Sequence, residues 1–498
     1  MSAKVGRGAV QGRTAGGLLF ALSLLHASAA LAWGLPARLE DPLYARPPVL
    51  DTGAVLPGDE HPVVCPSGGG FDQPLALDEA IDLALCNSPQ AKAAWAAIKI
   101  RAGAVGEARA AYLPTVTATL SQLHTRNEFP GRPQANNSSD GHTLYAGLSW
   151  RIFDFGTRAA NREAANLLLV AALTGYDAAI QKALAGVVGT YFDAMAARAS
   201  VAARAEASQL ARDTLDATER RERRGAAGQS DTLQARTALA KAQLAEQRAK
   251  ADYRKALAAL VYAVGLSPGA PVRLAEMSEA ITADSVNDLA GWLDEAKARH
   301  PAIVAARAQW DAAQAKVRQV RDEGLPTVDL TGNIYQNGYP NQGLQGTRST
   351  VTTVGVALTI PLFEGFARTY KIQGAAAQAE QSAAQFEDTE QQILTDVVKT
   401  HADAVSALSN LEASDALLKS ARAAMASSEK RYAKGAADIL ELLSTQSALA
   451  DALQERVRSV SEWHSARLRL IAAAGLLGRG QFAVISDRRE RSRVSAIH

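Results

Sequence analysis

The sequence is poor in cysteine, in aromatic residues and in net charge. Its 498 residues include two cysteines and 5% aromatic residues, and 53 Lys plus Arg against 51 Asp plus Glu leave a net charge of +2. Two cysteines exclude a disulfide-dense scaffold and any cysteine-rich zinc or iron–sulfur site. A charge near zero argues against bulk nucleic-acid binding, so no nucleic-acid partner is expected.

Long apolar runs are also scarce, and the first one has the pattern of an export signal. Three basic residues precede the apolar run 18–25, and the small-residue segment 27–32 follows it. This order predicts a signal peptide over residues 1–32. A membrane anchor is the alternative, but the run is too short to span a bilayer. No later segment offers ~18 to 20 uninterrupted apolar residues, so any membrane insertion of the exported chain must use strands.

Residues 33–74 form an extension rich in proline and glycine. This composition indicates irregular chain rather than a folded core. Cys65 lies in the extension, and Cys86 lies in the first helical segment. In an oxidising compartment the two could form a disulfide that ties the extension to the body, which the sequence favours over two buried or free thiols.

Alanine supplies much of the hydrophobic content, which is 47% of the chain. It occurs in runs such as 91–97 and 375–384. An alanine-rich, aromatic-poor chain with many Lys, Arg, Glu and Gln favours long helices that pack closely together.

The body of the chain is a sequence pattern that occurs twice, and such a duplication decides the fold. Five landmarks recur in the same order, two at an offset of 212 residues and three at an offset of 210. They are Asn87-Ser88-Pro89 with Arg299-His300-Pro301, Leu-Pro-Thr-Val at 113–116 and 325–328, Phe153-Asp154 with Phe363-Glu364, Gly225-Ala226-Ala227 with Gly435-Ala436-Ala437, and Gly265-Leu266 with Gly475-Leu476. We expect a first repeat at 75–271, a linker at 272–288, a second repeat at 289–477 and a basic tail at 478–498.

Both repeats predict the same order of elements. Period-two alternation of apolar and polar residues indicates strands, and a glycine commonly ends a long helix. In the first repeat we expect an opening helix at 89–112, strands that include the alternating residues 116–121 and 144–152, a long helix at 157–224 and a return helix at 230–264. The second repeat predicts helices at 301–322, 367–434 and 439–474 and strands that include the alternating residues 328–331 and 354–360. The segments 125–142 and 337–350 are predicted as hairpin loops.

The four predicted strands pose a problem of closure. Each is close to the ~9 to 11 residues that a tilted membrane strand needs, but four strands cannot close a barrel, and an open edge in lipid leaves backbone groups unpaired. Several chains must therefore share one barrel; a soluble sheet is the alternative. Each long helix would extend ~100 Å and is too polar for lipid, so the helices would reach into an aqueous compartment.

The duplication, the hairpins, the Phe-acid segments and the glycine turns together resemble the TolC family of outer-membrane channels, over about residues 75–477. The resemblance implies a fold that is mainly α with a membrane β-barrel: a homotrimer in outer-membrane lipid whose twelve strands form one barrel and whose helices form a periplasmic tunnel. It also implies a periplasmic adaptor protein and an inner-membrane ABC exporter or proton-driven pump as partners. The segment 85–90, with Trp95 and Cys65-Pro66, resembles the CyaE type, which serves type I secretion of a toxin.

The resemblance places the functional residues at the periplasmic helical turns. In the family, polar contacts near these turns hold the tunnel closed, and the matching positions are Asp231 and Tyr432. A phenol can donate a hydrogen bond to a carboxylate, which would form a breakable latch. The family's next partner, an arginine, falls on Ala437, which weakens the latch or moves the cation to Lys434 or Arg431.

Further roles implied by the resemblance are an acidic ring and a docking surface. Glu441 matches the first ring position at the tunnel entrance, whereas Ser444 replaces the second acid. Three lumenal copies of Glu441 would favour cations. The turns 224–228 and 434–438 would dock the adaptor, through Gly225, Ala226, Gly228, Gly435 and Ala436. Ordinary surface residues beside a turn are the alternative for all these positions.

No enzyme motif accompanies these features. The sequence has no P-loop, no GxGxxG after a strand, no GxSxG and no HExxH, and its eight histidines lack metal-ligand spacing. We therefore expect neither catalysis nor a cofactor. The predicted function is an outer-membrane exit duct for type I protein secretion; the alternatives are a channel of a multidrug efflux pump and a soluble periplasmic coiled-coil scaffold.

Overall fold

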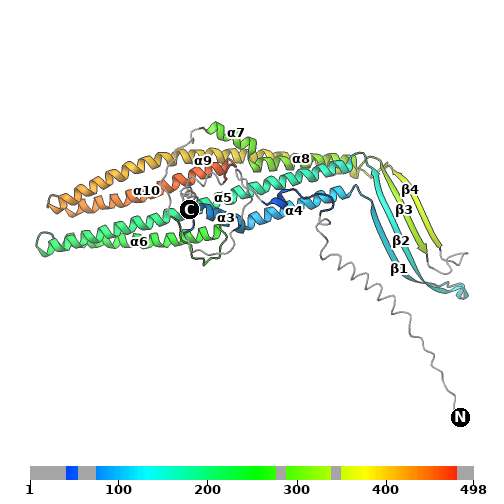
Figure 1. Cartoon of the computed structure of the whole chain (residues 1–498), viewed down its shortest axis with the longest axis horizontal. Coiled ribbons are helices and arrows are strands. Elements are labelled where there is room, and N and C mark those ends of the chain that lie inside the picture. Colours follow the sequence, from blue (N-terminus) through cyan, green and yellow to red (C-terminus); the bar gives the residue numbers. More distant parts are fainter. Residues whose placement is uncertain (1–40, 54–64, 66–73, 276–287, 338–348, 479–498) are drawn as a thin grey trace, which may run out of the picture.

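The computed structural model describes residues 41–53, 65, 74–275, 288–337 and 349–478. The predicted signal peptide lies outside the described residues, as do all but the first residue of the predicted tail. Long helices form an elongated body, and a sheet extends from one end of it (Figure 1). The mainly helical fold with a small antiparallel sheet and a duplicated unit is confirmed.

The two repeats contain the same elements in the same order. The first repeat comprises α3 (Leu77–Asn87), α4 (Pro89–Ala110), β1 (Thr115–Asn127), β2 (Asn137–Phe153), α5 (Thr157–Arg223) and α6 (Gln229–Ala263). The second comprises α7 (Leu289–Arg299), α8 (Pro301–Asp322), β3 (Thr327–Asn337), β4 (Ser349–Thr359), α9 (Ala367–Ala433) and α10 (Ile439–Ala473). The ends of all six predicted helices agree with the structure to within two residues, because proline and glycine mark most of them.

Two expectations about local structure were wrong. The short helices α3 and α7 had not been predicted as separate elements, although each stops just before the residue that caps the next helix. The segment 125–142 was predicted as a loop, but β1 runs to Asn127 and β2 starts at Asn137. Polar residues continue the ladder there, as in the contact of 2.7 Å between His124 Nδ1 and Asp140 Oδ1. Alternation of apolar residues cannot reveal a strand that is polar on both faces.

The helix junctions explain the first and last landmarks of the repeat. Ser88 starts α4 by accepting the N–H of Ala91 at 3.2 Å, and the ring nitrogen of His300 accepts that of Ala302 at 3.2 Å to start α8. The return helices end on left-handed glycines, one of which, Gly475, packs against this second junction. A serine hydroxyl and a buried histidine thus perform the same capping task.

The sheet has the order β1-β2-β3-β4 with all neighbours antiparallel, so β2 and β3 join the hairpins of the two repeats. The register places apolar residues opposite one another on one face, as in the pairs Val116 with Leu148 and Leu330 with Val356. This face is uncovered, and Val354 on it is 75% exposed.

The other face of the sheet is polar. Arg151 forms a salt bridge of 2.9 Å with Asp329 of the neighbouring strand, and the hydroxyl of Tyr145 donates to Asn333 Oδ1 at 2.8 Å. Within the described residues β1 pairs only with β2 and β4 only with β3, which leaves two open edges.

The helices form two long rods side by side (Figure 1). The helix α5 packs against α4 and α6, which follow one another along it, and α9 packs in the same way against α8 and α10. The main hydrophobic core lies mid-way along the body, where large side chains such as Phe192, Leu184, Ile81, Leu260 and Leu468 are fully buried. Elsewhere alanine and serine bring the helices close together.

One described helix, α5, contains a window of mean hydropathy 1.3 that is apolar enough by length and composition to cross a membrane. Only 22% of that window is buried inside the chain. Charged residues at 163, 177 and 182 divide the helix, so no uninterrupted apolar run of that length is present. The single chain therefore leaves part of the apolar surface of α5 uncovered.

Part of the N-terminal extension is ordered against the body, whereas we had expected irregular chain throughout. Residues 41–53 contain the single-turn helix α2 (Val49–Thr52). The guanidinium of Arg109 on α4 donates to the backbone carbonyls of Leu43, at 2.7 Å, and of Tyr44. A disulfide joins Cys65 to Cys86 of α3. The extension thus contacts the first repeat at two points.

Candidate functional site

The candidate site is built on the turns that join α5 to α6 and α9 to α10, at the end of the body opposite the sheet (Figure 1). Each long helix ends on a left-handed glycine, Gly225 with φ 72° and Gly435 with φ 76°. In the first turn the N–H of Ala226 donates to the carbonyl of Arg221 at 2.9 Å, and the second turn repeats this bond 210 residues later. Such a Schellman motif satisfies the last free carbonyls of a helix.

The five residues expected to dock an adaptor are all exposed at these turns. They are Gly225, Ala226, Gly228, Gly435 and Ala436. Because the two turns share one backbone conformation, any difference in the contacts they make must come from their side chains.

Tyr432 is buried in the last turn of α9, with 7% of its surface exposed. It packs with Met425, Ile439 and Leu442 in a small hydrophobic cluster. Its hydroxyl lies 3.2 Å from Oγ1 of Thr218 on α5. Because the Thr218 hydroxyl donates to the carbonyl of Thr214 at 2.8 Å, the phenol is the donor in this pair. The aromatic ring of one hairpin is therefore held by the other.

Asp231 does not meet Tyr432 in this chain, contrary to the predicted latch. Its carboxylate accepts the N–H of Gly228 at 3.4 Å, while its own N–H donates to the Gly228 carbonyl at 3.0 Å. This reciprocal contact caps α6. The phenol bonds Thr218 instead, so the polar contact joins α9 to α5 rather than to α6.

Glu441 is paired rather than isolated. Arg431 Nη1 lies 2.9 Å from Glu441 Oε1, and the same guanidinium donates to the Ala436 carbonyl at 3.3 Å. Arg431, one of the two cations considered in place of the missing arginine, thus bonds Glu441 rather than Asp231 or the Tyr432 hydroxyl. Lys434 is exposed at the turn. The position Ala437 packs against the hydrophobic cluster around Tyr432.

Sequence reasoning missed two residues of this site, Thr218 and Arg221. Arg221 belongs to the basic segment 220–224 at the end of α5. Its guanidinium carbon lies 4.5 Å from the centre of the Tyr432 ring, and Nη1 donates to the Tyr432 carbonyl. The only sequence signal was indirect: Arg221 and Arg431 occupy equivalent positions of the repeat.

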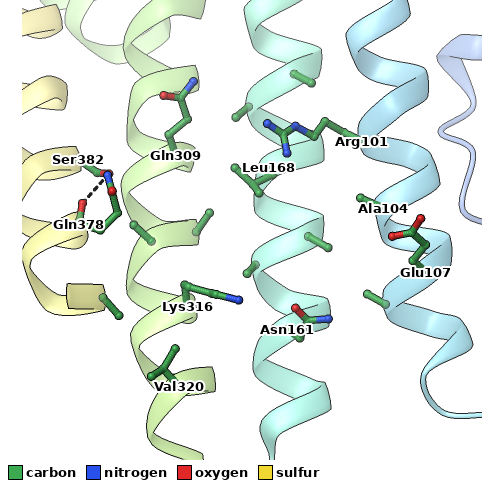
Figure 2. A pocket seen from close by; sticks show the side chains of 18 of the residues that line it. Arg101, Ala104, Glu107, Asn161, Leu168, Gln309, Lys316, Val320, Gln378 and Ser382 are labelled. Atoms are coloured by element: carbon green, nitrogen blue, oxygen red, sulfur yellow. Dashed lines mark hydrogen bonds between the residues drawn. The ribbon is translucent and has the colours of Figure 1, made fainter. Parts of the chain in front are cut away.

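A second feature of the body is a groove of about 990 Å³ across α4, α5, α8 and α9. Figure 2 shows these helices side by side, with Arg101 and Glu107 on α4 and Lys316 on α8. Most other residues of its wall are alanines or neutral polar residues. Within the described ranges, no group of three or more His, Cys, Asp or Glu residues could hold a metal ion.

The family pattern described as outer membrane efflux protein matches residues 80–266 and 292–476. The chain belongs to this family, the TolC family of outer-membrane channels. Each matched segment coincides with one structural repeat, and the two together cover most of the chain.

Among curated relatives, Protein CyaE of Bordetella pertussis is 38% identical over 91% of this chain and 94% of its own length. Alkaline protease secretion protein AprF of Pseudomonas aeruginosa is 25% identical over 83% of this chain and 87% of its own length. The resemblance to the CyaE type is confirmed by the first of these matches.

Solved structures of outer-membrane channels have the same fold. The channel OprN superposes with a TM-score of 0.70 at 20% identity, covering 83% of this chain and 99% of its own. VceC of Vibrio cholerae superposes with a TM-score of 0.69 at 23% identity, covering 80% and 96%. The chain is thus an outer-membrane channel protein by family, with the fold of these solved channels.

Proposed function

We propose that three copies of this chain form an exit duct for type I protein secretion. The observation that carries the proposal is the four-stranded sheet, which has one apolar face, one polar face and two open edges. In lipid an open edge is too costly, so the sheet must be closed by further copies. Twelve strands with their apolar faces outward then enclose a polar pore.

The cargo assignment rests on relatives. AprF and Proteases secretion protein PrtF of Dickeya chrysanthemi are named for protease secretion, and PrtF is 22% identical over 83% of this chain. A multidrug or siderophore efflux channel is the second candidate, since Pyoverdine export outer membrane protein OpmQ is 28% identical over 75% of the chain.

The partners follow from this role. The duct has no nucleotide motif, so energy must come from an inner-membrane ABC exporter, or from a proton-driven pump if the cargo is small. A periplasmic adaptor would dock on the exposed turns at Gly225 and Gly435. We propose no catalytic role for the chain and no nucleic-acid partner.

The mouth of the duct would be closed at the same turns. Tyr432 and Asp231 lie there, with Lys434 exposed beside them. Glu441 would face the lumen as a ring of three copies, but each is paired with Arg431 at 2.9 Å. The pair offsets the acidic charge, so we expect weaker cation preference than an unpaired ring would give.

Expression with candidate exporters tests the function. A strain that lacks its own channel would receive this chain with a type I ABC exporter and adaptor, or with an efflux pump and its adaptor. We expect secretion of the type I substrate into the medium with the first set. Drug resistance restored by the second set alone would favour efflux, and a mature protein extracted without detergent as a monomer would refute the channel.

A further inference from the structure

We propose that Arg221, assisted by Thr218, is the positioning residue that closes the duct, by clamping the second helical hairpin (α9 and α10) of each chain to the first (α5 and α6). The mouth opens only when Arg221 leaves Tyr432. This inference rests on the proposed function, because only a duct has a mouth to close.

Three contacts of different chemistry converge on Tyr432 from α5. The guanidinium of Arg221 stacks on the ring, with its carbon 4.5 Å from the ring centre. The same group donates to the backbone carbonyl of Tyr432, and Thr218 accepts the phenol proton at 3.2 Å. Because Tyr432 is 7% exposed and Thr218 is fully buried, little water competes for these contacts.

Arg221 also sits where both long helices end. Its own carbonyl accepts the N–H of Ala226, which closes the first turn. Its side chain reaches the carbonyl of Tyr432, which already accepts the N–H of Gly435 in the second turn. A cation at the C-terminus of α9 is favoured by the helix dipole. One residue therefore ties the ends of the two hairpins together.

The repeat supplies an internal comparison. Arg431 is the equivalent of Arg221 at the offset of 210, but it turns back onto its own hairpin and pairs with Glu441 at 2.9 Å. The equivalent of Tyr432 is Glu222, which accepts the hydroxyl of Thr232 within the first hairpin. Near the turns, the contacts of Arg221 and Thr218 with Tyr432 cross between the hairpins, so separation of the hairpin ends must break them.

Conductance of the purified trimer in planar bilayers tests the clamp. We expect Arg221→Ala to raise the open fraction about tenfold, a ratio that corresponds to ~1.4 kcal/mol. Thr218→Val and Tyr432→Phe should give smaller increases, because each removes the hydroxyl contact and keeps the stacked guanidinium. The matched control is Arg220→Ala, which removes an exposed charge from the preceding residue and should behave as wild type.

A distance measurement separates the clamp from a general effect of charge. Spin labels on Ala226→Cys and Ala436→Cys, both exposed at the turns, report the separation of the hairpins when one labelled chain is diluted among unlabelled ones. The native cysteines form a disulfide and stay unlabelled. The label distance should increase in Arg221→Ala and stay unchanged in Arg220→Ala.

The outcomes distinguish the two proposals. If Arg221→Ala leaves both the open fraction and the label distance at wild-type values, the clamp is wrong and the duct stands. If the label distance increases but no variant conducts, Arg221 still holds the two hairpins together, but the proposed function fails and with it the role of Arg221 in closing a duct. Should Arg221→Ala not fold, the same readouts on Thr218→Val and Tyr432→Phe decide, and unchanged values in both overturn the clamp.

Discussion

At the scale of single residues, the left-handed glycines differ in what surrounds them. A Cβ at Gly475, with φ 76°, would lie 2.8 Å from Cδ of Pro301 and 3.4 Å from Cα of His300. A Cβ at Gly225, with φ 72°, would meet nothing within 4 Å. The first glycine is needed for its conformation and its size, the second for conformation alone.

These surroundings predict different losses of folding stability when each glycine is replaced by alanine. Gly225→Ala should destabilise the fold by roughly 1–2 kcal/mol, the cost of a left-handed residue that carries a Cβ. Gly475→Ala should cost more, because the rigid ring of Pro301 must also shift. Thermal unfolding of both variants checks this order. An equal loss of stability would show that the junction of α7 and α8 accommodates a methyl group.

A buried histidine gives the fold a pH dependence. His464 is 3% exposed, stacks on Phe192 with ring centres 5.6 Å apart, and has no partner at Nε2 within the described structure. Burial, followed by the charge of Arg467, lowers the pKa of His464 below the ordinary 6.5. Below that pH the unfolded chain binds a proton that the folded chain does not, so stability falls with pH.

Replacing this histidine should therefore flatten the acid side of the stability profile. We expect the melting temperature of His464→Leu to fall less than that of the wild type between about pH 6.5 and pH 5. Above pH 7 the imidazole is neutral in both states and the two curves should run parallel. Parallel curves at every pH would mean that other groups, such as buried His300, account for the acid sensitivity.

At the scale of elements, each strand-to-helix turn contains a salt bridge between an acidic residue and an arginine, and the two salt bridges differ in burial. In the first repeat, Arg158 Nε bonds Asp154 Oδ2 at 2.9 Å, and the two side chains are only 12% and 8% exposed. Arg158 also donates to the carbonyls of Arg151 and Ile152 and stacks on Tyr112. These contacts join the turn after α4, the end of β2 and the start of α5, where the sheet meets the body.

The equivalent pair of the second repeat provides a matched test. Arg368 bonds Glu364 at 3.2 Å through Nε, but the two side chains are 24% and 40% exposed. We expect Arg158→Ala to cost about 3–5 kcal/mol, because it leaves a buried carboxylate unpaired. Arg368→Ala should cost less, because water can solvate Glu364. Thermal unfolding or protease resistance of the two variants measures the difference, and an equal cost would contradict the role of burial.

At the scale of the whole molecule, the two faces of the sheet predict how the chain sits in the membrane. Val354 lies on the apolar face in the middle of β4, and the adjacent Thr353 faces the polar side opposite Asn333. An arginine at the first position would face lipid and cost ~2–4 kcal/mol at the bilayer midplane, whereas one at the second would face water.

Assembly of paired variants checks this orientation. We expect Val354→Arg to reduce the yield of trimers in the outer membrane and Thr353→Arg to leave it near wild type, as seen by semi-native electrophoresis. Both substitutions introduce the same side chain, one residue apart, so the β propensity of arginine cannot explain a difference in trimer yield between them. The opposite result would place the apolar face inside the assembly and refute the barrel.

Much of the fold could be predicted because its signals are local. Pro89 and Pro301 start helices and Gly225 and Gly435 end them through their own backbone geometry, and alternation revealed the part of each strand nearest the helices. The polar ends of β1 and β2 escaped prediction because their pairing depends on the partner strand. The residues expected at the candidate site lie at the two glycine turns, but the contacts among them depend on tertiary packing and could not be predicted.

By itself, the sequence determined the duplication, the helix boundaries and the apolar faces, since each follows from neighbours along the chain. Only the tertiary structure decided which residues meet. In the structure β2 pairs with β3, and Tyr432 contacts Thr218 and Arg221 rather than Asp231. Arg431 forms an ion pair with Glu441. Arg221 and Arg431 have equivalent positions in the repeat but different partners, because a long side chain bonds whatever the packing of other helices brings within its reach.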